Sequence, residues 1–189
     1  MKSRLAILSF AISCAFAGNV MAMTKEEYKV QKDRVSADYT AGKEMCSAMT
    51  SNATDICQAE AKGAQKVAKA ELESLYKPSA RHTEDVALAK GDAMYGVAKE
   101  KCDDMTGNAK DVCVKEAKAA HVKAKEEAKV ARVAADPSKN KVEKVSEAKK
   151  DATAEMSEAN YKAAKERCDS LAGNAKDTCE KDAKAKFRM

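Results

Sequence analysis

Residues 161–179 read YKAAKERCDSLAGNAKDTC, and the same pattern occurs twice earlier in the chain. Each copy has two cysteines separated by ten residues, with an Asn-Ala-x-Asp sequence just after the midpoint. The three cysteine pairs are Cys46 and Cys57, Cys102 and Cys113, and Cys168 and Cys179. Because this module recurs through most of the chain, it decides the fold.

The flanks of each cysteine pair are rich in alanine, lysine and acidic residues, with apolar residues at helical spacing, and so predict helices. Between them, Gly173 can end one helix in the left-handed conformation. Asn174 can cap the next helix, and Asp177 can reach back as in a capping box. The equivalent turn residues of the other copies are Gly107, Asn108 and Asp111, and Ser51, Asn52 and Asp55. The first copy therefore has serine where the other two have glycine.

Two disulfide arrangements fit this spacing. If the chain turns at Gly173, Cys168 and Cys179 face each other across two antiparallel helices, within reach of a disulfide. If one helix continues through, the two cysteines lie about 16 Å apart and must bond to other repeats. The stop and start signals at the midpoint favour a bond within each repeat.

Residues 1–22 have the three parts of a secretory signal peptide. Lys2 and Arg4 supply the positive end, an apolar run follows, and small residues precede a cleavage site after Ala22, with Ala17 as a second option. The apolar run is short for a membrane span. We expect no membrane span after cleavage.

Removing the signal peptide also removes Cys14 and leaves the six cysteines of the repeat. An even number of cysteines in an exported chain predicts a disulfide protein in an oxidising compartment. The periplasm is the expected location.

The charge balance argues against nucleic-acid binding. The chain has 35 Lys and Arg against 30 Asp and Glu, so losing Lys2 and Arg4 leaves 33 against 30. The two signs are mixed along the chain, which is typical of solvated helix faces. Aromatic residues make up 4% and tryptophan is absent. Since alanine buries little area, disulfides are expected to compensate for a thin core.

The sequence predicts an all-α fold of three disulfide-stapled helical hairpins, arranged as an extended or up-and-down bundle. The hairpins are expected at residues 23–78, 79–136 and 137–189. Helices are predicted at 25–50, 53–76, a third capped by Ser79 or Thr83, 109–135, 137–172 and 175–187. Thr24 with Glu27 forms a capping-box signal, and Asp136-Pro137 predicts the start of the fifth helix.

The order of the breaks predicts the arrangement of the hairpins. Cysteine turns alternate with the breaks at Pro78 and Pro137, so an up-and-down arrangement places all three disulfides at one end. The fifth helix is much longer than the sixth, which leaves part of the fifth uncovered.

No catalytic or metal-binding pattern is recognisable. His82 and His121 do not lie at metal-ligand spacing from the cysteines, and both are expected at the solvated surface. No nucleophile motif or phosphate-binding loop is present. We therefore expect no catalytic residue, no metal and no cofactor. Each repeat has a tyrosine seven residues before its first cysteine: Tyr39, Tyr95 and Tyr161. These tyrosines are predicted to pack beneath the disulfides. The alternative is that all three line a ligand groove.

The module over residues 165–179, Lys-Glu-Arg-Cys-Asp-Ser-Leu-Ala-Gly-Asn-Ala-Lys-Asp-Thr-Cys, resembles exported proteins of Gram-negative bacteria that carry such cysteine pairs in Ala/Lys-rich helices. The resemblance covers most of the mature chain and carries over no activity and no catalytic residue. In composition these proteins are also similar to the long central helix of TolA.

These observations favour a non-enzymatic periplasmic helical repeat protein with a structural, envelope-stress or protein-interaction role. Its expected partners are other envelope proteins or further copies of itself, and not nucleic acid. The alternative is a periplasmic metal- or redox-responsive binding protein that uses the cysteine pairs as thiols.

Overall fold

The computed structural model describes residues 23–189, so the predicted signal peptide lies outside the described part of the chain. These residues form helices and loops without a strand. The helices are α1 (Lys25–Cys46), α2 (Asn52–Tyr76), α3 (Ala80–Cys102), α4 (Gly107–Ala135), α5 (Lys141–Cys168) and α6 (Gly173–Phe187). The all-α prediction and the up-and-down order of stapled hairpins are confirmed.

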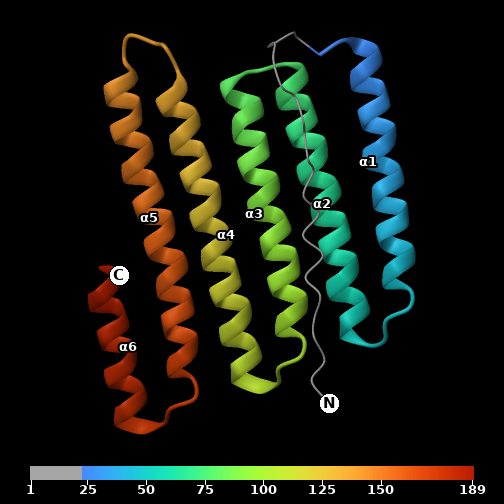
Figure 1. The fold of residues 1–189 in the computed structure, drawn as a ribbon. Helices are drawn as coiled ribbons and strands as arrows, with labels where there is room; N and C mark the ends of the chain where they lie inside the picture. The colour runs from blue at the N-terminus through green and yellow to red at the C-terminus, as the bar shows by residue number, and fades with distance from the viewer. Residues whose placement is uncertain (1–22) are drawn as a thin grey trace, which may run out of the picture.

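The helices lie side by side in a single antiparallel row (Figure 1). Within residues 23–189 each helix packs only against the helices before and after it in the chain. The row is therefore open, with two broad faces that no further helix covers, and α1 and α6 form its outer edges. Since α6 is about half as long as α5, the half of α5 farther from the cysteine turn has no helix on its outer side (Figure 1).

Small residues bring neighbouring helices close together. A Cβ atom placed on Gly63 of α2 would lie 2.7 Å from the Cβ of Ala93 on α3, and one placed on Gly91 would lie 3.0 Å from the Cβ of Ala124 on α4. Apart from Leu72, the buried apolar side chains of the described residues are cysteines and alanines. The packing is close but the apolar area per helix is small, as the composition predicts.

Several predicted helix ends are wrong. α1 ends at Cys46 and not near residue 50, because the chain tightens there, with Met49 N bonding to Cys46 O at 3.1 Å. The fifth helix spans 141–168 and not 137–172. Asp136 does not cap it, because its carboxylate accepts a bond from Ser138 N at 2.9 Å and folds the chain into a loop. The capping box of Thr24 with Glu27 is confirmed.

The proposed capping roles in the cysteine turns are also wrong. Gly107 and Gly173 do not end a helix but begin the next one, with φ of 58° and 55°. The asparagines and aspartates make no side-chain cap, because they lie inside the second helix of each hairpin rather than before it: Asn52, Asp55, Asn108, Asp111, Asn174 and Asp177.

Candidate functional site: the disulfide end

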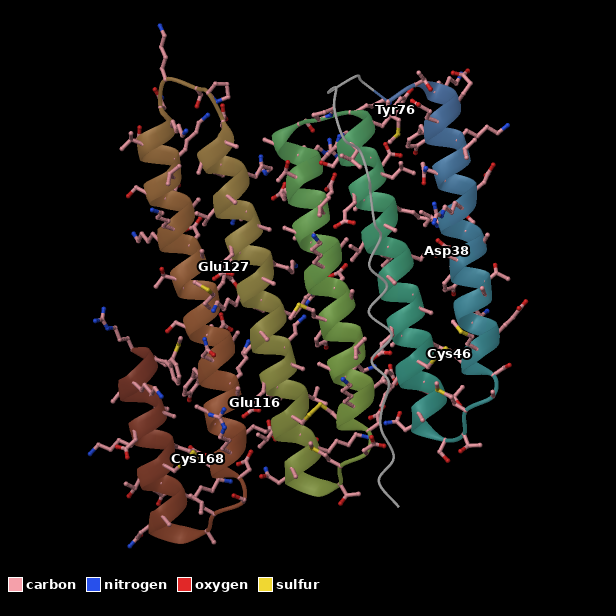
Figure 2. All side chains as sticks on the ribbon, viewed as in Figure 1. Asp38, Cys46, Tyr76, Glu116, Glu127 and Cys168 are labelled. Atoms are coloured by element: carbon pink, nitrogen blue, oxygen red, sulfur yellow. A yellow bond between two sulfur atoms is a disulfide. The ribbon has the colours of Figure 1, made fainter. Side chains whose placement is uncertain are left out.

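The three disulfides join the two helices of each hairpin. Their Cα–Cα distances are 5.5 Å for Cys46–Cys57, 5.6 Å for Cys102–Cys113 and 5.7 Å for Cys168–Cys179. The pairing within each repeat is thus confirmed over the pairing between repeats. Figure 2 shows Cys46 and Cys168 near the same end of the row, where all three cysteine turns lie. We call this the disulfide end.

The repeated asparagine connects one hairpin to the next. Asn52 donates from Nδ2 to Glu100 O at 2.7 Å and to Asp104 Oδ1 at 2.9 Å, which joins α2 to α3. Asn108 donates to Glu166 O at 2.9 Å, which joins α4 to α5. Sequence reasoning missed this role. The available signal was that every copy has both the asparagine and a glutamate two residues before its first cysteine.

A second feature of the disulfide end is a row of half-exposed apolar side chains. Met49, Met105 and Leu171 each follow the first cysteine of a repeat by three residues, and they are 46%, 45% and 42% exposed. We call these three residues the apolar row. Each belongs to a turn closed by a disulfide, and the three turns, one per hairpin, lie at the same end of the row (Figure 1).

Charged pairs hold two of the three turns. Lys110 Nζ lies 2.8 Å from Asp103 Oδ1, and Lys176 Nζ lies 2.7 Å from Asp169 Oδ1. The hydrogen bonds from these lysines hold the pKa of both aspartates below the ordinary value and raise the pKa of the lysines. The first turn has Ser47 at the aspartate position and no such pair in the described structure.

The histidine of α4 is mostly buried, which corrects the prediction of a solvated side chain. His121 is 11% exposed, its Nε2 lies 2.7 Å from Asp92 Oδ1, and its ring stacks on Tyr95 with centroids 4.7 Å apart. This cluster joins α3 to α4. His82 lies near the start of α3, with Nδ1 against Lys77 O.

The repeated tyrosines do not share one ligand groove. Tyr39 lines an open hollow of about 440 Å³ over α1, α2 and α3, together with Lys43, Lys62 and Lys66 and with acidic and small residues. Tyr95 instead packs against α4 through His121. Neither Tyr95 nor Tyr161 lines that hollow, so this hollow does not support the alternative of a groove lined by all three.

An aromatic cluster lies at the end of the row opposite the disulfides, where Figure 2 shows Tyr76. Tyr28 of α1 stacks on Tyr76 of α2 with centroids 4.5 Å apart, and its hydroxyl donates to the Glu73 carboxylate. This hydrogen bond is the main cause that raises the pKa of Tyr28, because ionising the phenol would break it. The cluster therefore fastens the start of α1 to the end of α2.

Metal-binding clusters and membrane-spanning helices are both absent from residues 23–189. No group of three or more His, Cys, Asp or Glu side chains there is placed to hold a metal ion. No helix in this part of the chain has the length and apolar character needed to cross a membrane. Comparisons with protein-family models, with curated proteins and with solved structures gave no match.

Proposed function

We propose that the protein is a non-enzymatic interaction protein of the periplasm, and that its disulfide end binds non-native segments of other envelope proteins. The apolar row is the observation that carries this proposal. A non-native segment exposes apolar side chains along an extended backbone, and three separated apolar contacts in one line match such a segment better than a compact pocket does.

The construction of the turns supports this role. Methionine adapts its flexible side chain to varied partners. Here Met49, Met105 and Leu171 belong to turns that the disulfides already hold in place. Few residues of the protein therefore lose conformational entropy when a segment binds. No further helix among residues 23–189 packs over the row, so the disulfide end is accessible.

The proposed compartment rests on the cysteines. Disulfides inside each repeat are typical of proteins that fold in an oxidising, non-cytoplasmic space. Residues 1–22 have the composition of a bacterial signal peptide. Together these features favour the periplasm.

The test is suppression of aggregation. A chemically denatured protein is diluted into buffer with the oxidised chain, and light scattering is followed. We expect the wild-type chain to reduce scattering and the triple variant Met49→Ser, Met105→Ser, Leu171→Ser to lose most of this effect.

A matched control removes three exposed apolar side chains that lie outside the row: Val30→Ser, Leu75→Ser and Met94→Ser. This control should keep the suppression, and thermal unfolding should verify that both triple variants fold. Equal activity of the two triple variants would refute a role of the apolar row. A turnover abolished by one substitution outside the cysteines would refute the non-enzymatic proposal itself.

The second candidate function is a metal- or redox-responsive binding protein that uses the cysteine pairs as thiols. The observation in its favour is that the second cysteine of each pair, unlike the first, is partly exposed: Cys57, Cys113 and Cys179. A reductant can therefore reach these sulfurs. Alkylation of the protein directly in periplasmic extracts tests it, because a substantial free-thiol fraction is expected for this function and almost none for a structural one.

A further inference from the structure

The two interfaces between hairpins use the same contact. In both, the repeated asparagine donates to the carbonyl of the glutamate two residues before the next cysteine, at 2.7 Å for Asn52 and Glu100 and at 2.9 Å for Asn108 and Glu166. In the second interface Lys115 Nζ also lies 3.9 Å from Glu166 Oε2. An asparagine and a glutamate thus define the contact, and a lysine strengthens it in one case.

Small residues accompany this contact. Gly63 of α2 approaches Ala93 of α3 so closely that an added Cβ would lie 2.7 Å from the Ala93 Cβ. In the second interface the position of Gly63 is occupied by Ala119 and the position of Ala93 by Ala159, and Ala119 is buried. Ala163 of α5, five residues before its cysteine, is also buried.

The outer edges of the row carry the two halves of this contact without a partner helix. On α6 the corresponding residues are Asn174, Lys181 and Ala185, and all three are exposed. On α1 they are Glu44, Ala37 and Ala41, and these are exposed as well. Unlike the side chains of Asn52 and Asn108, the side chain of Asn174 makes no hydrogen bond to another described residue.

We infer that the outer edge of α6 binds the outer edge of α1 of a second copy of this chain. Asn174 would donate to the Glu44 carbonyl of the second copy, Lys181 would pair with the Glu44 carboxylate, and Ala185 would face Ala37. The inference rests on continuity with the two internal interfaces: equivalent residues make the asparagine contact in both and the lysine contact in the second. Because the two edges differ, the contact is head to tail and produces rings or filaments.

Three features make this contact weaker than the internal ones. α6 has 15 residues against 29 in α4, so it covers only part of α1. The Arg167–Glu116 pair of the second interface (Nε to Oε1, 3.0 Å) has no counterpart, because Met45 and Asp182 occupy those positions. The Ser47 hydroxyl donates to Glu44 O at 2.6 Å and must rotate away before Asn174 can bind. Association is therefore expected at high concentration, such as a confined compartment provides.

Sedimentation velocity of the oxidised protein, from micromolar to millimolar concentration, tests the inference. We expect reversible association that Lys181→Glu weakens about tenfold, since it places like charges together. Glu44→Lys should weaken association equally. A mixture of these two variants should restore association, with the two variants alternating along the row. The carboxylate introduced on α6 of one chain then faces the ammonium group introduced on α1 of the other, and the unchanged Lys181 and Glu44 pair at the next contact. Ser47→Ala should strengthen self-association.

The control is Lys184→Glu, which makes the same charge change on α6 away from the edge. The equivalent lysine of α4, Lys118, lies over the Tyr95 ring of its own hairpin, 5.4 Å from the ring centroid. Lys184→Glu should therefore associate like the wild type. A wild-type chain that stays monomeric at all concentrations, or a mixture that associates no better than either variant alone, would overturn the inference. The apolar row is not part of this contact, so aggregation suppression and self-association can fail independently.

Discussion

The first cysteine turn and the other two have the same backbone shape but different chemistry. Ser51 has φ 54° and ψ −148°, while Gly107 and Gly173 have φ of 58° and 55°. This region is nearly restricted to glycine, and a side chain there costs about 1–3 kcal/mol. The first turn also lacks the aspartate–lysine pair of the others. A disulfide is thus able to impose on serine a turn that glycine adopts freely.

Removing a disulfide should have the largest effect and should expose this difference. We expect Cys168→Ala with Cys179→Ala to cost about 3 kcal/mol, from the entropy of closing a loop of this length. Cys46→Ala with Cys57→Ala should cost a similar amount but leave α1–α2 the less stable hairpin, because its turn keeps the strained Ser51 and no longer has the bond. Hydrogen exchange resolved for each hairpin measures both. A first turn that stays protected without its disulfide would contradict the strain at Ser51.

Exchanging the turn residues tests the same comparison directly. Ser51→Gly should stabilise the first hairpin by about 1 kcal/mol, since it relieves the positive φ. Gly107→Ser should destabilise the second hairpin by a similar amount. A Cβ added to Gly107 or Gly173 would meet no heavy atom within 4 Å beyond its chain neighbours and the backbone of its own helix, so the effect isolates backbone conformation. Urea unfolding measures it, and equal stability of all variants would show that the turn is not strained.

The Tyr28–Glu73 hydrogen bond, at the end of the first hairpin opposite its disulfide, should also contribute to the stability of that hairpin. Tyr28→Phe keeps the stacking on Tyr76 and removes the bond to Glu73, so we expect a loss of about 1 kcal/mol. The folded pKa of Tyr28 is raised, so this contribution is present below the unfolded pKa of about 10 and is lost as the pH rises through the folded pKa. Tyr76→Phe is the control without that bond. A wild-type chain whose stability relative to Tyr28→Phe did not fall at alkaline pH would contradict this role.

The smallest expected effect concerns acid pH. The folded pKa values of Asp103 and Asp169 are lowered, so their stabilisation is present above the unfolded pKa of about 4 and is lost as the pH falls through the folded values. The first turn, with Ser47, should not change in this range. Hydrogen exchange at the three turns across acid pH should show the second and third turns approaching the first. Asp103→Asn should remove the pH dependence of the second turn.

Much of the fold could be predicted from the repeat. The six helices, the disulfides within each hairpin and their common end follow from cysteine spacing, turn residues and proline breaks. The helix ends at Cys46 and Cys168 and the late start of α5 could not be predicted, because they depend on local hydrogen bonds such as that of Asp136. The capping roles failed because a shift of one or two residues moves a side chain from one neighbour to another.

The candidate sites, like the fold, were predictable from the sequence only in part. The repeat alone predicts three equal modules, with an asparagine, a glutamate and an apolar residue at matching positions in each. The contacts of Asn52 and Asn108 with the next hairpin, and the common end of the turns that contain Met49, Met105 and Leu171, become visible with the three-dimensional structure. The physical reason is that spacing along the chain fixes contacts within a hairpin, whereas contacts between hairpins depend on how helices pack in space.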